Sequence, residues 1–372
     1  MKIKGSFKIW AAGLAIFSMF FGSGNLVFPL LLGQNAQNET FFGIVGLLLT
    51  DVLMPFLGVL AMILVNGDYQ RFFGWLGRIP SLLICGSIIA LIGPFGVLPR
   101  CLTIAHAGFK MYIPGFSLLS FSILACALIY FASLRKGRMM NILGYILTPL
   151  LLLSLAVIVV KGLFSMPPIE VGSMSSGQAF VLGLSEGYNM MDLLAAFFFS
   201  KTVLMYFKDS EGVHLSRTLK AGIIGMSLLG LTYIAFAFLG ASFSTTLQGV
   251  AHEQLLMQIA YSVLGSFGGR VATLAIILAC LTTAMALADV TVNFLVQDIF
   301  KGKLKKRTAM LLTLLISVFV SMFEFSGIAQ FLGPILQICY PFFIVLTLIN
   351  LVRFFLEWKR VKKNPLDFRD VA

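Results

Sequence analysis

Residues 20–29 read FFGSGNLVFP and place two glycines, a serine and an asparagine inside an otherwise apolar segment. A second apolar segment is interrupted at residues 185–192, SEGYNMMD, by two carboxylates, a glycine, an asparagine and a tyrosine. Hydrocarbon cannot satisfy freed backbone N–H and C=O groups, so backbone at membrane depth leaves helical geometry only where protein or a cavity surrounds it. Broken helices at matching places in two halves of a chain are typical of the midplane binding sites of secondary transporters. The two segments therefore predict a transporter.

The composition is that of an all-α integral membrane protein. Of the 372 residues, 59% are hydrophobic and 11% are charged, and the mean hydropathy is +0.98. These values exclude a soluble globular protein. We predict about ten transmembrane helices, at residues 9–32, 41–65, 81–107, 115–132, 142–164, 179–207, 221–242, 271–299, 309–323 and 327–355.

The distribution of Lys and Arg orients these spans. Alternate connections are basic, and the positive-inside bias assigns them to the cytoplasm. They contain Lys2, Lys4, Lys8, Arg71, Arg78, Arg135, Lys136, Arg138, Lys208, Arg217, Lys220, Lys301, Lys303, Lys305, Lys306, Arg307, Lys359, Arg360, Lys362, Lys363 and Arg369. The opposite connections, residues 33–40, 165–178 and 243–269, contain neither Lys nor Arg. Both termini are therefore expected in the cytoplasm. The net charge of +12 needs no nucleic-acid partner, because the anionic cytoplasmic leaflet attracts basic residues.

Two other features of the sequence argue against a cleaved signal peptide and against disulfide or metal cross-links. Lys2 and Lys4 before an apolar run resemble a signal peptide, but the run continues to a full span length and favours a membrane helix. The five cysteines all fall inside predicted spans and show no CxxC or Cys/His spacing. Neither a disulfide framework nor a cysteine-based metal site is indicated.

Ten spans divide into two repeats of five, residues 1–164 and residues 165–372, the second of which ends in a short basic cytoplasmic tail. An odd number of spans per repeat turns the second repeat upside down relative to the first. Each interrupted segment then lies in the first span of its repeat. We expect one integral membrane domain with this inverted symmetry.

Five motifs distributed over both halves resemble the branched-chain amino acid:cation symporter family, the BrnQ-type carriers of bacteria. They are FFGSGNLVFP at 20–29, IGPFGVLPR at 92–100, LSEGYNMMD at 184–192, LACLTTAMAL at 278–287 and GPILQICYPFFIVL at 333–346. The resemblance implies a LeuT-type fold with helices 1 and 6 broken. It also implies cation-driven uptake of leucine, isoleucine and valine across the bacterial inner membrane, with sodium as the expected ion.

The substrate of such a carrier is a zwitterion, which needs partners for its carboxylate and its ammonium. A half-helix beginning near Gly24 and Asn25 would offer free N–H groups and a positive dipole end to the carboxylate. Carbonyls of the other half-helices, around Phe20, Phe21, Leu184 and Ser185, would accept from the ammonium. We expect the substrate-binding residues to be Gly22, Ser23, Gly24, Asn25, Glu186, Gly187 and Tyr188. The alternative for Gly22 and Gly24 is close helix packing.

Glu186 has two possible roles. A carboxylate near the bilayer centre is costly and is normally buried in the bundle and functional. Glu186 either binds the substrate ammonium or bonds the broken backbone of the first span, and the second role is favoured because irregular backbone needs support. Asp192, Arg100 and Asp289 are expected to have structural or gating roles.

The adjacent Thr282 and Thr283 are candidates for a sodium site, since hard cations favour oxygen ligands. The resemblance implies that their hydroxyls join backbone carbonyls near Ser18 and Phe21 as the cation-binding set. The alternative is that both threonines bond back to their own helix. Lys201 either snorkels to the cytoplasmic interface or faces the cavity, where its ammonium would substitute for a bound cation.

Alternative functions remain at this point. The coupling ion is sodium or a proton, no other cofactor is expected, and the substrate range is branched-chain or more broadly neutral amino acids. A membrane-embedded transferase would need clustered His, Asp or Cys at a catalytic spacing, which the sequence does not contain, so we expect no enzyme. A channel would need a continuous polar lining, whereas the polar residues here gather at two breaks and one threonine pair. The expected partners are the amino acid and the lipid bilayer.

Overall fold

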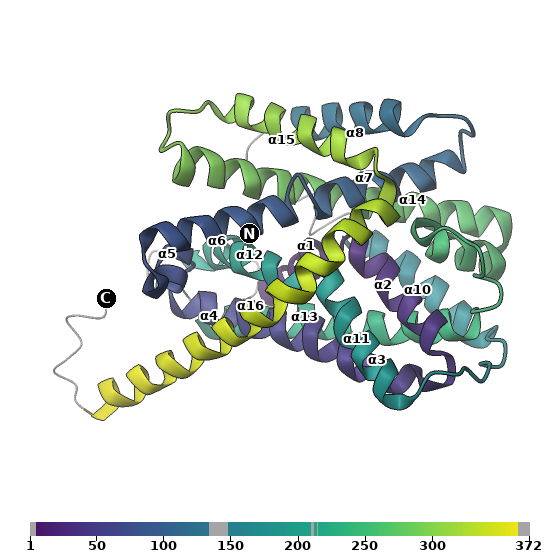
Figure 1. Ribbon diagram of the computed structural model, residues 1–372, viewed down its shortest axis with the longest axis horizontal. Coiled ribbons are helices and arrows are strands. Elements are labelled where there is room, and N and C mark those ends of the chain that lie inside the picture. Colours follow the sequence, from purple (N-terminus) through teal and green to yellow (C-terminus); the bar gives the residue numbers. More distant parts are fainter. Residues whose placement is uncertain (1–4, 134–147, 210–211, 214, 364–372) are drawn as a thin grey trace.

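A computed structural model describes residues 5–133, 148–209, 212–213 and 215–363, and most of them are helical (Figure 1). The basic residues Lys2, Lys4, Arg135, Lys136, Arg138 and Arg369 lie outside the described residues. So does the start of the predicted span at 142–164.

Helices occupy every range in which we predict a span. The first half contains α1 (Gly5–Phe20), α2 (Ser23–Ala36), the 3-10 turn η1 (Gln37–Glu39), α3 (Thr40–Leu48), the π-helix η2 (Leu49–Leu53), α4 (Met54–Leu64), α5 (Tyr69–Phe73), the 3-10 turn η3 (Gly74–Leu76), α6 (Arg78–Ile92), α7 (Val97–Lys110), α8 (Leu118–Ser133) and α10 (Thr148–Phe164). The second half contains α11 (Ser176–Met190), α12 (Asp192–Tyr206), α13 (Leu215–Ser242), the 3-10 turn η5 (His252–Gln254), α14 (Leu255–Phe294), the π-helix η6 (Leu295–Ile299), α15 (Lys306–Ser321) and α16 (Glu324–Lys363). A short antiparallel hairpin pairs β1 (Lys208–Asp209) with β2 (Gly212–Val213).

Several helical stretches are long and apolar enough to cross a membrane. They are Ser23–Leu64, Arg78–Lys110, Ser216–Ser242, His252–Ile299 and Glu324–Phe354. Shorter apolar helices are Lys8–Phe20, Leu118–Ser133 and Pro149–Phe164. The protein is therefore a multi-pass, all-helical membrane protein, as the composition predicts.

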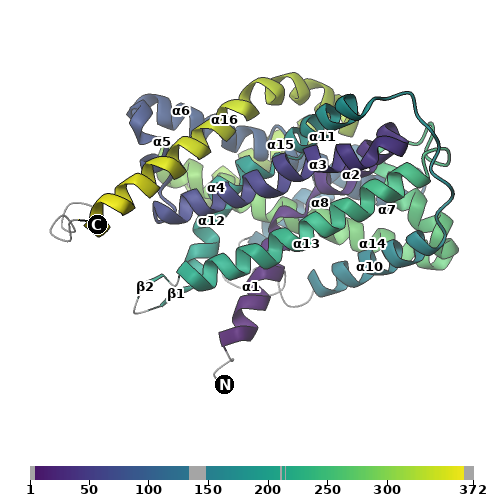
Figure 2. The same ribbon diagram turned by 90° about the horizontal axis from the view of Figure 1, so that it is seen from below.

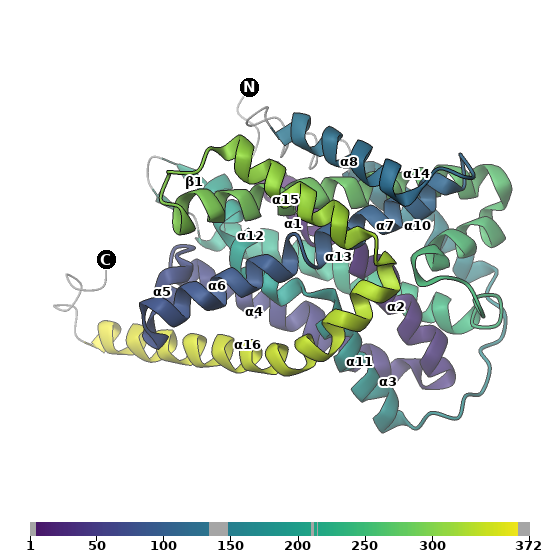
Figure 3. The same ribbon diagram turned by 45° about the horizontal axis from the view of Figure 1, so that its top comes forward.

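The helices run mostly along the long axis of the molecule, and α13 lies beside α1 and α2 (Figure 2). Helices α8 and α15 pack together along one edge, next to α14 and α7 (Figure 3). Helix α16 changes direction in its first half (Figure 3). Pro334 and Pro341 lie inside this helix, and each removes a backbone donor and clashes with the preceding turn.

The first interrupted span breaks where the sequence predicts it. Helix α1 ends at Phe20, and α2 begins at Ser23 after an extended Gly22 with φ −116° and ψ −155°. The break is short because the Asn25 side chain accepts the Gly22 N–H at 2.8 Å and so caps the new helix.

The second interrupted span breaks at the end of the predicted segment. Helix α11 continues through Ser185 and Glu186 to Met190, and only Met191 leaves helical geometry, with φ 66° and ψ 19°. The expectation of free carbonyls at Leu184 and Ser185 is therefore wrong, since α11 continues for five residues beyond Ser185 and ends at Met190. A non-glycine residue in the left-handed region costs about 1 kcal/mol or more, and it persists where the surrounding structure fixes it.

A third break divides the span predicted at 81–107. Helix α6 ends at Ile92 and α7 begins at Val97, with a turn at residues 93–96 between them. The sequence predicts a single uninterrupted span there. The glycines explain the difference, because a side chain at Gly96 would meet the Leu91 carbonyl oxygen at 2.0 Å.

Helix α14 begins before its predicted span. The sequence predicts a start at residue 271, whereas α14 begins at Leu255 and is kinked at Gly265, where φ is 68°. Such a backbone conformation is readily available only to glycine. The residues before Gly265 therefore form a separate helical arm joined to the spanning part.

Glycines bring α3 and α11 into backbone contact. A Cβ at Gly183 would lie 2.0 Å from the Gly43 carbonyl oxygen, and one at Gly46 would lie 2.3 Å from the Phe180 oxygen. Small residues at a helix crossing allow this close approach in a membrane, where van der Waals packing drives association. The crossing holds α11, the first half of the second broken span, against the span that follows the first broken span.

We expect Gly183→Ala to lower the stability of the protein by at least about 1–3 kcal/mol, because the added methyl group forces α3 and α11 apart. Thermal unfolding of the detergent-solubilised protein measures this. Gly86→Ala is the control: a Cβ there meets nothing within 4 Å, so the melting temperature should stay the same or rise slightly. Equal melting temperatures for both variants would contradict the role of the crossing.

Candidate substrate and cation site

Asn25 joins the two broken spans. Its side-chain oxygen accepts the Gly22 N–H, and its Nδ2 donates to Asp192 Oδ2 at 2.8 Å and to the Tyr233 hydroxyl. Asn25 is 2% exposed and Asp192 is 4% exposed. The amide thus supports the irregular backbone of one break and bonds the first residue of α12 at the other.

Two tyrosines complete this junction. The Tyr233 hydroxyl, on α13, donates to Asp192 Oδ2 at 3.1 Å. The Tyr340 hydroxyl, on α16, accepts the Leu193 N–H at 3.0 Å. This N–H is one of the first in α12 and has no partner within its own helix. Four helices therefore supply the hydrogen bonds that hold the second break.

Glu186 does not support the first break, contrary to the favoured expectation. Its Oε2 accepts from Asn189 Nδ2 at 3.1 Å, one turn along α11. Asn25 and Asp192 perform the supporting role instead, because the break in α11 lies at Met191 and brings Asp192 rather than Glu186 to the junction. Of the two predicted roles of Glu186, contact with the substrate ammonium is the one left open.

Arg100 lies beside Glu186 at the start of α7. It is 1% exposed, its Nη1 donates to the Asn189 carbonyl at 2.8 Å, and its guanidinium carbon lies 5.4 Å from the Phe28 ring centre. Its Nε and Nη2 meet no acceptor among the described residues. Arg100 follows directly on the third break and faces α2 and α11.

The start of α2 approaches the end of α11. A Cβ at Gly24 would lie 3.1 Å from the Met190 Cα. Ser23 is fully buried, and its hydroxyl meets no partner among the described residues. The N-terminus of one half-helix, with its positive dipole end, therefore meets the C-terminus of another, with its negative end.

Gly187 and Tyr188 face other helices. A Cβ at Gly187 would lie 1.9 Å from Thr50 Oγ1, so this glycine serves the close approach of α11 to η2. The half-buried Tyr188 ring is tilted against the Tyr340 ring, with centres 4.8 Å apart. Neither contact tests a role in substrate binding.

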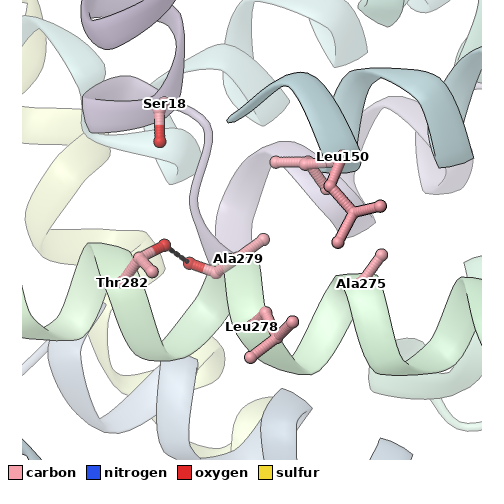
Figure 4. A pocket seen from close by; sticks show the side chains of 7 residues that line it. Ser18, Leu150, Ala275, Leu278, Ala279 and Thr282 are labelled. Carbon is pink, nitrogen blue, oxygen red and sulfur yellow. Dashed lines mark hydrogen bonds between the residues drawn. The ribbon is translucent and has the colours of Figure 1, made fainter. Parts of the chain in front are cut away.

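The four residues predicted to bind a cation form two contacts between the first broken span and α14. The Thr283 hydroxyl donates to the Phe21 carbonyl at 3.2 Å, across the first break. Ser18 and Thr282 line a small, partly open cavity of about 10 Å³ together with leucines and alanines of α10 and α14 (Figure 4), and the Ser18 hydroxyl points toward Thr282. That volume is close to the space needed by one water molecule. The Thr282 hydroxyl also donates to the Ala279 carbonyl at 2.8 Å. Thr282 therefore bonds back to its own helix, and the lone pairs of its oxygen stay available to a cation.

Asp289 and Lys201 lie away from the two breaks. Asp289 forms an ion pair with Lys306 at 3.2 Å, at the start of α15. Lys201 lines a cavity of about 300 Å³ between α12 and the end of α14, together with Tyr69 and Asp298. The Tyr69 hydroxyl donates to Asp298, and burial together with this carboxylate raises the pKa of Tyr69. Lys201 therefore faces a cavity, but not the one beside Thr282.

The sequence did not identify Asn189, Tyr233 or Tyr340 as part of the site. Asn189 was visible within SEGYNMMD, and Tyr340 lies within one of the family motifs. Tyr233 is a single hydroxyl in a long apolar span, and no local pattern indicates that it meets Asp192. Only the packing of α13 against α1 and α2 brings it there.

Comparison with known proteins assigns the family. The profile described as "Branched-chain amino acid transport protein" matches residues 6–367. The chain belongs to this family. It is 30% identical over 355 residues to the branched-chain amino acid permease BraB of Bacillus subtilis, covering 91% of this chain and 79% of BraB. It is also 30% identical over 368 residues to the branched-chain amino acid transport system 2 carrier protein of Pseudomonas aeruginosa, covering 93% and 80%. The relatives are permeases and carriers, and the chain is a member of a transporter family, not an enzyme family.

Solved structures support the fold. A Na⁺-coupled sialic acid symporter in a substrate-bound outward-open state matches 94% of this chain and 79% of its own, with a TM-score of 0.60 and 14% identity. The inward-facing conformation of Mhp1 matches 91% and 75%, with a TM-score of 0.63 and 14% identity. The protein thus shares the fold of these transporters, the LeuT-type fold expected from the motifs.

We expect Asn25→Ala to destabilise the protein by about 2–3 kcal/mol, because it leaves the buried Asp192 carboxylate and the Gly22 N–H without their partner. Thermal unfolding in detergent measures the change. Asn35→Ala on the exposed face of the same helix is the control and should change stability by no more than about 0.5 kcal/mol. An Asn25 variant as stable as the control would show that the junction does not depend on this amide.

Proposed function

We propose that this protein is a secondary active transporter that imports leucine, isoleucine and valine into the cytoplasm by alternating access, with sodium as the coupling ion. It has ten spans in the bacterial inner membrane, arranged as two inverted repeats, residues 1–164 and 165–372, and both termini are cytoplasmic. The names of its relatives support the substrate class.

The proposal rests on the contact between the start of α2 and the end of α11. Amino acids bear a carboxylate and an ammonium at a fixed separation, and the start of α2 and the end of α11 offer a positive and a negative dipole end side by side. In the proposed site the carboxylate binds N–H groups at Ser23 and Gly24. The ammonium binds Glu186 and the last carbonyls of α11.

The cavity beside the first break is the proposed sodium site. Ser18 and Thr282 line it, and Thr283 bonds the Phe21 carbonyl next to it. Hydroxyl and carbonyl oxygens suit a hard cation. A cation there would bind the end of α1 to α14, so the position of α1 would depend on sodium. The fold match to a Na⁺-coupled symporter supports this assignment.

Arg100 and Glu186 form the proposed gate on the outer side of the substrate. Both lie on outer half-helices under the positive-inside orientation, and Arg100 bonds α11 through the Asn189 carbonyl. The cavity lined by Tyr69 and Lys201 lies toward the basic, cytoplasmic connections and is the proposed inner exit.

The substrate range follows from an apolar lining. One methylene in such a pocket changes binding by only about 1–3 kcal/mol, so leucine, isoleucine and valine should compete within about two orders of magnitude in affinity. Charged amino acids should fail, because their side-chain charge stays unpaired and desolvated. Competition against radiolabelled leucine in proteoliposomes measures both effects. Strong inhibition by lysine or glutamate with none by valine would overturn the substrate assignment, and inhibition by alanine or serine would indicate a broader neutral range.

Sodium coupling is tested at the threonine pair. The double change Thr282→Val and Thr283→Val keeps the side-chain shape and removes two oxygens, so stimulation of leucine uptake by a sodium gradient should be largely lost. Thr313→Val is the control, since this buried threonine bonds its own helix in α15 at 2.9 Å. Unchanged sodium dependence in the double variant would place the coupling site elsewhere.

A further inference from the structure

Asp51 is a buried carboxylate in an unusual backbone setting. It is 0% exposed and lies in the middle of η2, the π-helix between α3 and α4. Single π-helical turns inside α-helices frequently occur at functional sites. A charged side chain within a membrane span is costly unless a partner stabilises it. The sequences of α3 and α4 contain no charged residue, so any partner of Asp51 must come from another helix.

The groups that face Asp51 are known from the helices packed against η2. The Asp192 side chain, on α12, is within hydrogen-bonding range of Asp51, and the Tyr233 hydroxyl, on α13, lies beside both. Tyr340, on α16, is close enough to interact electrostatically with Asp51. On α11 the carboxylate of Glu186 bonds Asn189 instead. Asp51 therefore faces a second carboxylate and two phenols.

The hydrogen bonds around this pair lack one donor. Asp192 Oδ2 accepts from Asn25 and from Tyr233. The Tyr233 hydroxyl and the Asp192 N–H lie within range of Asp51, but neither makes a hydrogen bond of good geometry to an Asp51 oxygen, and the Tyr233 hydroxyl donates to Asp192 instead. Two ionised carboxylates accept but do not donate, and side by side in a dry site they repel each other. One proton shared by the pair supplies the missing donor and removes one of the two charges.

We propose that Asp51 and Asp192 form a proton-binding site, in which Asp51 carries the proton and donates it to Asp192. Asp51 is the protonated partner because Asp192 already has the two donors that stabilise a carboxylate. The site is distinct from the sodium cavity, which Ser18 and Thr282 line.

The coupling of this proton site to the transport cycle rests on the proposed function. Asp192 is the first residue of α12 and bonds Asn25 at the other break. When the contact between Asn25 and Asp192 opens, water reaches Asp51. The proton then passes to water, and Asp51 is left as a carboxylate. When the junction closes, Asp51 takes a proton from water and the repulsion between the two carboxylates is removed. If the closing step takes this proton from the outer side and the opening step releases it to the cytoplasm, one proton enters with each cycle, in addition to the sodium ion.

Infrared spectroscopy of the protein in lipid films tests the proton site without any substrate. The wild type should show the carbonyl stretch of a protonated carboxyl group at neutral pH. Asp51→Asn, whose amide donates to Asp192 in the same way, should lack that band. Glu170→Gln, a change at an exposed loop carboxylate, should retain it. Absence of the band from the wild type overturns the proposal. So does a band that persists in Asp51→Asn or disappears in Glu186→Gln.

A transport measurement tests the link to the cycle. A pH-sensitive dye inside sodium-loaded proteoliposomes should report protons entering with leucine in the wild type and in Glu170→Gln, and no leucine-driven proton entry in Asp51→Asn. Leucine transport by the wild type without proton movement overturns the link. If the wild type transports no leucine under any gradient, the proposed function fails, whereas the infrared result still decides the proton site.

Discussion

The hydrogen bonds of Asn25 hold two interrupted helices together where no water is available to do so. A break in a membrane helix frees backbone groups that hydrocarbon cannot satisfy, and one amide serves both breaks by accepting from Gly22 and donating to Asp192. The neighbouring features depend on this link. The start of α2 reaches the end of α11, the Phe21 carbonyl turns toward Thr283, and Asp192 comes within range of Asp51. A polar side chain that was expected to hold substrate is thus the support on which the candidate site is built.

The sequence predicted the parts of this arrangement that depend on composition and local pattern. The class of protein, the places of the helices and the first break follow from long apolar runs interrupted by FFGSGNLVFP. The family resemblance suggested Ser18, Phe21, Thr282 and Thr283 as the cation residues, and the structure places them in two contacts between the first broken span and α14.

The parts that sequence did not predict depend on packing between distant segments. The second break was predicted within residues 185–192, with free carbonyls at Leu184 and Ser185, but α11 continues past them, Gly187 serves the contact with Thr50, and the irregular residue is Met191. The same shift gave the supporting role to Asp192 instead of Glu186. Asp51 appeared in the sequence only as a carboxylate in an apolar span, because the register of η2 against α12 and α13 cannot be read from either segment alone.

The glycine crossing between α3 and α11 has a consequence for motion. Where side chains interlock, two helices can slide by repacking, but at Gly43, Gly46 and Gly183 the backbones themselves touch and leave nothing to rearrange. This contact favours movement of α3 and α11 as one unit. In the proposed alternating access, rocking of that unit would displace the span carrying Asp51 along with α11, so the moving unit would draw on segments from both halves of the chain.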